Sequence, residues 1–160
     1  MADDSHSAAS DFQPDISLEV HECWALLRVE AYGRLAVVGR DGPEIFPVNV
    51  RVDRGTIVFR TAAGNKLAAL RDDPRVAFEV DGYDDVDRTV WSVVIRGTAK
   101  LVSDQYDGLD AVELGVTPWQ HGPKPEFVRI VPTTVSGRRF ERAKRSEWSV
   151  PNVHRTTSVD

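Results

Sequence analysis

Residues 45–61 read Ile-Phe-Pro-Val-Asn-Val-Arg-Val-Asp-Arg-Gly-Thr-Ile-Val-Phe-Arg-Thr, and this stretch decides the fold. Apolar side chains alternate with other residues over 45–52, which is the period of a half-buried strand. Turn-forming residues occupy 53–55, and a second β-branched run follows over 56–61. Two strands separated by so short a turn pair as an antiparallel hairpin. The stretch therefore predicts an antiparallel sheet.

The same periodicity extends the sheet in both directions along the chain. Short apolar or alternating runs predict further strands at 35–38, 76–80, 89–102 and 127–140. Gly97, inside the run over 89–102, predicts a bulge or bend of the kind that barrels require. Six strands without βαβ units indicate a mainly β (α+β) protein, whose sheet closes as an antiparallel barrel.

Two to three short helices are expected beside the barrel. Helical spacing of apolar residues predicts one over 18–29, with Ser17 as its N-cap. A second helix is predicted over about 65–72, because the period becomes helical there and Pro74 ends it. A third is predicted over about 103–114.

The chain of 160 residues has the size of one domain. Residues 1–15 hold little to bury and are expected to form a disordered leader. Residues 16–140 form the predicted domain, and 141–160 form a polar, basic tail whose role stays open. The acidic start lacks the pattern of a secretory signal, so a cytoplasmic protein is expected.

Composition argues against several classes of function. A formal net charge of −5 disfavours a general nucleic-acid surface, and no stretch approaches the ~20 apolar residues of a membrane helix. The single Cys23 excludes an internal disulfide and a multi-cysteine zinc site. Asp81, Asp84, Asp85 and Asp87 lack the spacing of a calcium loop and predict a solvated hairpin tip, so no metal site is expected.

The segment 59–67 carries the most specific chemistry. A strand ends here, Gly64 turns the chain, and a helix begins, so backbone N–H groups at the helix N-terminus can bind an anion. Arg60, Thr61 and Lys66 offer a forked donor, a hydroxyl and a compact charge at the same place. The residues fit either a phosphate monoester site or a plain strand–helix junction with solvated basic side chains.

Many segments, taken in their order and spacing, carry a family resemblance that covers about residues 18–140. They are Gly33-Arg34-Leu35-Ala36, Pro47-Val48-Asn49, Phe59-Arg60-Thr61, Gly64, Lys66-Leu67, Val76-Ala77-Phe78-Glu79-Val80-Asp81, Trp91-Ser92-Val93-Val94, Gly97-Thr98-Ala99, Val128-Arg129-Ile130 and Gly137-Arg138-Arg139. Together they resemble the pyridoxamine 5′-phosphate oxidase-like FMN-binding family. The resemblance implies a split β-barrel that forms a homodimer, with FMN at the subunit boundary.

The resemblance also implies a set of cofactor-binding residues. The strand over Pro47 to Val50 would lie along the flavin ring, and the segment over Arg60 to Lys66 would hold the phosphate. Pro47 cannot donate to a strand ladder, which fits an edge or a ligand-facing position. Asn49 could bind the flavin or make a structural contact, and Trp119 could cover a pocket or a dimer groove. The full set is Pro47, Val48, Asn49, Val50, Arg60, Thr61, Lys66, Leu67 and Trp119.

The implied function is that of an FMN-dependent oxidoreductase acting on a small molecule, with hydride passing through the flavin N5. Neither the substrate nor a catalytic residue is identified. Oxidases of this name carry an Arg-Leu-His type element near the C-terminus, whereas residues 135–140 read Val-Ser-Gly-Arg-Arg-Phe, so true pyridoxamine 5′-phosphate oxidase activity is not expected. The alternatives are a reductase that uses the deazaflavin coenzyme F420, and a non-catalytic flavin-binding or sensing module.

Overall fold

The computed structural model describes residues 15–30, 32–102 and 126–141, which form one antiparallel sheet and two helices. The mainly β, antiparallel prediction is confirmed. In chain order the elements are β1 (Ile16–Leu18), α1 (Val20–Val29), β2 (Tyr32–Gly39), β3 (Gly42–Asp53), β4 (Thr56–Thr61), α2 (Asn65–Asp72), β5 (Arg75–Asp84), β6 (Thr89–Val102) and β7 (Glu126–Glu141).

The sheet closes on itself like a barrel. Its strand order is β1-β7-β4-β3-β2-β5-β6, and β6 also pairs with β7, so six strands form a ring and β1 is added beside β7. Two junctions in the ring are short. β2 pairs with β5 only from Arg34 to Val37. β3 pairs with β2 from Gly42 to Asn49, but it pairs with β4 only from Val50 to Asp53. This arrangement is compatible with the split β-barrel that the resemblance implied.

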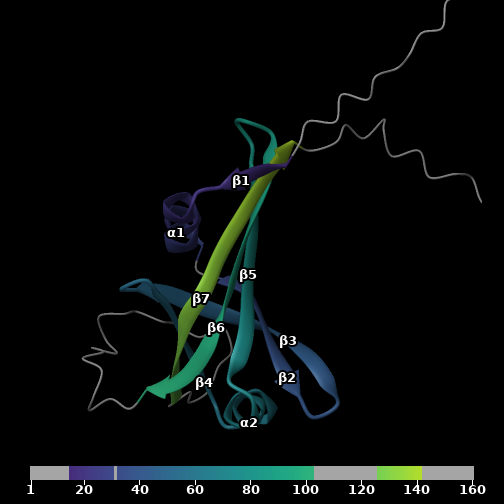
Figure 1. Ribbon diagram of the computed structural model, residues 1–160, viewed down its shortest axis with the longest axis vertical. Coiled ribbons are helices and arrows are strands. Elements are labelled where there is room, and N and C mark those ends of the chain that lie inside the picture. Colours follow the sequence, from purple (N-terminus) through teal and green to yellow (C-terminus); the bar gives the residue numbers. More distant parts are fainter. Residues whose placement is uncertain (1–14, 31, 103–125, 142–160) are drawn as a thin grey trace, which may run out of the picture.

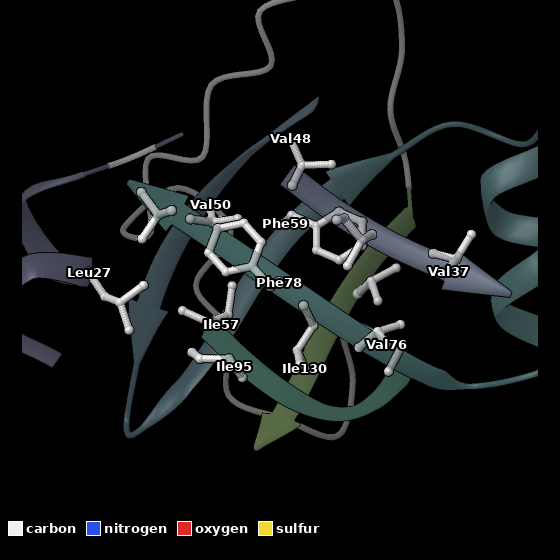
Figure 2. Packing of buried hydrophobic residues seen from close by; sticks show 14 of the residues in the cluster. Leu27, Val37, Val48, Val50, Ile57, Phe59, Val76, Phe78, Ile95 and Ile130 are labelled. Atoms are coloured by element: carbon white, nitrogen blue, oxygen red, sulfur yellow. The ribbon is translucent and has the colours of Figure 1, made fainter. Parts of the chain in front are cut away.

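The barrel interior is filled by every second side chain of the strands. Phe59, Phe78, Ile57, Ile95 and Ile130 are fully buried, and Figure 2 shows them with neighbouring valines converging on one apolar interior. Burying each such side chain stabilises the fold by roughly 1.5–3 kcal/mol relative to leaving it in water. The alternation over 45–52 therefore reflects one face in the core and one face outside. In β4, Ile57, Val58 and Phe59 are all buried, because Val58 packs in a second cluster with Val102 and Phe127.

The predicted irregularity at Gly97 is confirmed. The pairing of β6 with β7 shifts register between Arg96 and Gly97. A Cβ atom at Gly97 would lie 2.3 Å from the carbonyl oxygen of Val131, so the close approach of the two backbones requires glycine.

The two helices lie toward opposite ends of the molecule's long axis, α1 beside β7 and α2 below the ends of β2 and β5 (Figure 1). The predicted helix over 65–72 is confirmed, and its C-cap is Asp73. The predicted N-cap of the first helix is wrong. Ser17 lies in β1, where it pairs with Arg138 of β7. The N-cap is Glu19, whose backbone N–H donates to the Glu22 side chain at 2.7 Å.

Pairing with distant strands explains the other differences from prediction. β1 is a seventh strand, too short at three residues to show a period. Asp81 lies within β5, opposite Ser92, and not in the hairpin tip, because β5 continues to Asp84. The predicted helix over 103–114, residues 1–14 of the leader, 142–160 of the tail and Trp119 lie outside the described residues. No helix in the described ranges is long and apolar enough to cross a membrane.

Candidate functional site

The short junction between β3 and β4, here called the split, consists of residues 43–49 of β3 together with β4 and the start of α2. Pro47 lies opposite Arg34 of β2 and has no described strand on its other side. A residue without an N–H group fits such a one-sided position. Among the described strands Pro47 thus lies at an edge, one of the two positions that the sequence allowed, and its contact with a ligand stays a prediction.

The four predicted residues of β3 divide between the two faces of the strand. Val48 and Val50 are buried and point into the barrel interior with Phe59 (Figure 2). Pro47 is exposed and Asn49 is half-buried on the outer face. Only Pro47 and Asn49 can therefore present side chains on the outer face, whereas the two valines anchor the strand from within.

The start of α2 is open on the side of its N-cap. Gly64 has φ 156°, a conformation that side chains rarely adopt, and a Cβ atom there would meet nothing within 4 Å. The first turn of α2 carries no acidic residue, and its backbone N–H groups have no partners within the helix. Leu67 is buried and anchors the helix. The geometry suits an anion, because the helix dipole and the N–H groups both favour negative charge.

Lys66 lies between aromatic rings from both sides of the split. Its Nζ atom is 5.1 Å from the ring centroid of Phe46 on β3 and 6.0 Å from that of Phe59 on β4. Both distances are within the range of a cation–π interaction. The ammonium group thus lies between Phe59, the last residue of β4 that pairs with β3, and Phe46, which lies in the part of β3 that does not pair with β4.

Arg60 and Thr61 lie on opposite faces of β4. The guanidinium carbon of Arg60 is 5.1 Å from the ring centroid of Phe127, its directly paired neighbour on β7. Thr61 points toward the core, is 4 % exposed, and its hydroxyl donates to the Ala62 carbonyl oxygen at 3.2 Å. Of the three predicted residues, Lys66 lies in the first turn of α2. Arg60 lies on the outer face of β4, and Thr61 lies on the face that points toward the core.

The rings beneath the two cations were not found from the sequence. Phe46 was noted only as part of an alternating strand, and Phe127 only as the start of another. The register between β4 and β7 brings Phe127 beside Arg60, and this register is a long-range property. For Phe46, the one local signal in the sequence is that an aromatic residue stands near basic residues in the predicted hairpin over 45–61.

Two other charged clusters belong to the framework. On the outer face, Arg34 donates to Glu79 at 2.9 Å and to Asp81, and these hydrogen bonds, the one to Asp81 foremost, raise the pKa of Arg34. The second cluster ties the β3–β4 turn to β7, because Arg129 donates to Asp53 at 2.7 Å and to Thr56 at 2.6 Å.

No group of three or more His, Cys, Asp or Glu side chains within the described ranges could hold a metal ion. A hollow of about 260 Å³ lies over β6 and β7 and includes none of the predicted cofactor-binding residues; it is lined by Ser92, Val94, Arg96, Ser136, Gly137 and Arg138.

Comparison with known proteins gives a consistent result. A family model described as pyridoxamine 5′-phosphate oxidase matches residues 19–139. The structure resembles that of a Corynebacterium glutamicum protein, provisionally named a pyridoxamine 5′-phosphate oxidase, with a TM-score of 0.71 and 39 % identity over 81 % of this chain and 100 % of that one.

Two other similar proteins carry names that concern function. An FAD binding protein from Mycobacterium smegmatis has a TM-score of 0.65 and 37 % identity, covering 79 % of this chain and 98 % of its own. A 5a,11a-dehydrotetracycline/5a,11a-dehydrooxytetracycline reductase from Streptomyces rimosus is 40 % identical over 83 residues, which are 48 % of this chain and 58 % of the reductase.

Proposed function

We propose that this chain, which belongs to the pyridoxamine 5′-phosphate oxidase family, binds FMN at the split and is an oxidoreductase acting on a small molecule. The observation that carries the proposal is the position of Lys66, held by Phe46 and Phe59 beside the open N-terminus of α2. A cation and a set of backbone N–H donors at one place fit a terminal phosphate.

The residues present fit the cofactor in three respects. The open space at Gly64 admits a phosphate close to the backbone of α2. Lys66 supplies positive charge, and Arg60 adds more from the far side of β4. The one-sided segment of β3 with Pro47 and Asn49 offers an edge along which a flavin ring can lie. When bound, FMN would supply hydride transfer at its N5 atom, and the protein would supply binding and orientation.

The similarity to a named reductase and to an FAD binding protein supports redox chemistry and a flavin-type cofactor. FMN is proposed over the larger FAD because the residues at the split account for one phosphate group. Titration with FMN, FAD and the deazaflavin coenzyme, each followed by its own absorbance or fluorescence, distinguishes the three. Tighter binding of the deazaflavin than of FMN would contradict the proposal.

The phosphate assignment is tested by flavin fluorescence quenching. Removing a charge-assisted hydrogen bond costs roughly 1.5–3 kcal/mol, so Lys66→Ala should raise the Kd for FMN about tenfold or more. Arg60→Ala should raise it in the same direction. Lys100→Ala is the matched control, because Lys100 is an exposed lysine on β6 outside the split. Unchanged affinity in both Lys66→Ala and Arg60→Ala would exclude this site.

We also propose a homodimer. The outer face of the sheet carries an apolar row in which Ala36 lies between Ile45 and Ala77, and Ile45 is 68 % exposed. An exposed apolar sheet face of this kind is typical of a protein interface. Light scattering should give about twice 17.8 kDa, and Ile45→Glu should shift it toward the monomer. Val86→Glu, at an exposed hairpin tip, is the control. A wild-type monomer that still binds flavin would refute the dimer.

Oxidation of pyridoxamine 5′-phosphate is not part of the proposed activity. The segment Gly137–Phe140, which stands where a substrate-gripping element is expected, is paired with β6, and its first three residues also pair with β1. Gly137 itself is buried against α1, which further limits what this segment can present to a substrate. Formation of pyridoxal 5′-phosphate by the FMN-loaded protein in air at about 1 s⁻¹ or faster would contradict this expectation.

A further inference from the structure

Three cation–π contacts among the described residues involve the two cations assigned to the phosphate site. Arg60 lies over Phe127, and Lys66 lies over Phe46 and Phe59. We infer that Phe46 is a positioning residue of the phosphate site, whose ring holds the ammonium group of Lys66 where the phosphate binds. This inference rests on the proposed FMN function and names a residue that neither the family resemblance nor the sequence motif had included.

The two rings around Lys66 differ in their freedom. Phe59 is fully buried in the barrel interior, so its ring is fixed by core packing. Phe46 is only half-buried and belongs to the segment of β3 that pairs on one side. Because lysine has a long, flexible side chain, a second ring from another strand restricts it far more than one ring does. Phe46 packs only at the margin of the core, so its removal would release Lys66 at a smaller cost in core packing than removal of Phe59.

An aromatic ring suits this task better than a carboxylate does. Two arginines elsewhere in the described structure show the contact with an acid: Arg34 pairs with Glu79, and Arg129 pairs with Asp53. A carboxylate neutralises the charge of its partner, whereas the face of a ring attracts the cation and leaves its net charge in place. Contact with a ring therefore orders a lysine side chain without weakening its attraction for a dianionic phosphate, and this ordering precedes ligand binding.

The experiment compares FMN with riboflavin, which lacks the phosphate, by fluorescence quenching. Phe46→Leu removes the ring and should weaken FMN binding about three- to tenfold, as the loss of one cation–π contact and of side-chain order predicts. Riboflavin binding should not change. Phe46→Tyr keeps the ring and should restore the preference for FMN. In the Lys66→Ala background, Phe46→Leu should have no further effect on FMN binding.

The outcomes are separable. An equal loss for FMN and riboflavin in Phe46→Leu, or the same loss for FMN in the Lys66→Ala background, would overturn the inference, because Phe46 would then act independently of Lys66. An unchanged preference for FMN in Phe46→Leu would also overturn it while leaving the proposed function intact. A wild-type chain that binds neither flavin would refute both. Should Phe46→Leu fold poorly, Phe46→Met tests the loss of the ring with similar volume, and thermal melting of each variant confirms the folded state.

Discussion

The β6–β7 pair and the β3–β4 pair belong to the same ring, where the β4–β7 pair lies between them, yet they are built differently. β6 pairs with β7 along its whole length from Thr89 to Val102, and we call this pair the closed seam. β3 pairs with β4 only from Val50 to Asp53, which leaves the split. The closed seam satisfies its backbone hydrogen bonds within the sheet and contributes stability. Along the split, β3 has a paired strand on one side only among the described strands, and this is where we propose that a ligand binds.

Gly97 and Gly64 show the same difference in the space around a single Cβ position. At Gly97 in the closed seam, an added Cβ would collide with the backbone of Val131. At Gly64 beside the split, an added Cβ would meet nothing within 4 Å, and the restriction there is the backbone conformation alone. Packing therefore dictates glycine in the first region, and conformation and access dictate it in the second. Substitutions at these positions should separate stability from binding.

The largest effect is expected for Gly97→Ala. The new methyl group would lie 2.3 Å from the Val131 carbonyl oxygen, and a paired backbone cannot move aside without breaking the ladder. We expect the free energy of unfolding to fall by about 3 kcal/mol, at the upper end for overpacking. Denaturant unfolding measures this loss, and Thr98→Ala at the adjacent position is the control. A loss below about 1 kcal/mol would show that the closed seam can yield at its bulge.

A smaller effect is expected for Gly137→Ala, because the atoms in its way belong to side chains. Its Cβ would lie 2.7 Å from Sγ of Cys23 on α1, and the helix can shift. We expect a loss of about 2 kcal/mol. Burial raises the pKa of the Cys23 thiol, so the native protein should react slowly with thiol reagents, and Gly137→Ala should speed the reaction as α1 loosens. An unchanged labelling rate would contradict the displacement of α1.

At the split, Gly64→Ala should affect stability less and binding more. A side chain at φ 156° costs of order 1 kcal/mol in strain and tilts the first N–H groups of α2. Gly55→Ala is the matched control, since Gly55 also has positive φ and open space, but lies in the β3–β4 turn. Both variants should lose similar stability, whereas only Gly64→Ala should weaken FMN binding. Equal FMN affinity in the two variants would contradict the role of the α2 N-terminus.

The same contrast explains what the sequence could predict. Helix α2 was predicted to its terminal residues because its limits are local: Gly64 begins it and Asp73-Pro74 ends it. Lys66 and the N-terminus of α2 were assigned to one site for the same reason. β1 was missed because three residues have no detectable period, and its existence depends on pairing with Gly137–Arg139 at the other end of the chain.

Long-range register accounts for the remainder of the site. Successive side chains of a strand point to opposite faces, so Arg60 lies on the face of β4 opposite Phe59 and Thr61. The sequence motif grouped Arg60 and Thr61 because they are adjacent in the chain, and this grouping ignored the alternation. The ring beneath Arg60 comes from β7, and the first of the rings beside Lys66 comes from a part of β3 that does not pair with β4. Such contacts depend on which strands become neighbours, and no single stretch of sequence specifies that.

The smallest expected effect lies at the other end of α2 and tests whether the split depends on it. The Asp73 carboxylate accepts hydrogen bonds from the side chain of Arg75, at 2.6 Å from its Nη2, and from its backbone N–H at 3.0 Å, and these lower the pKa of Asp73 from 3.8 to about 2. A lowered folded-state pKa means that the contribution to stability is present above about pH 4 and is lost as pH falls toward 2. Arg75→Ala should return the pKa of Asp73, followed by NMR of its carboxyl carbon, toward 3.8 and should flatten this acid-dependent loss of stability.

The Asp73–Arg75 pair is exposed to solvent, which screens its interaction, so FMN affinity at neutral pH should be unchanged in Arg75→Ala. A weakened FMN affinity in Arg75→Ala would show that the Asp73–Arg75 pair at the C-terminus of α2 helps to position Gly64 and Lys66. The split would then depend on the far end of the helix.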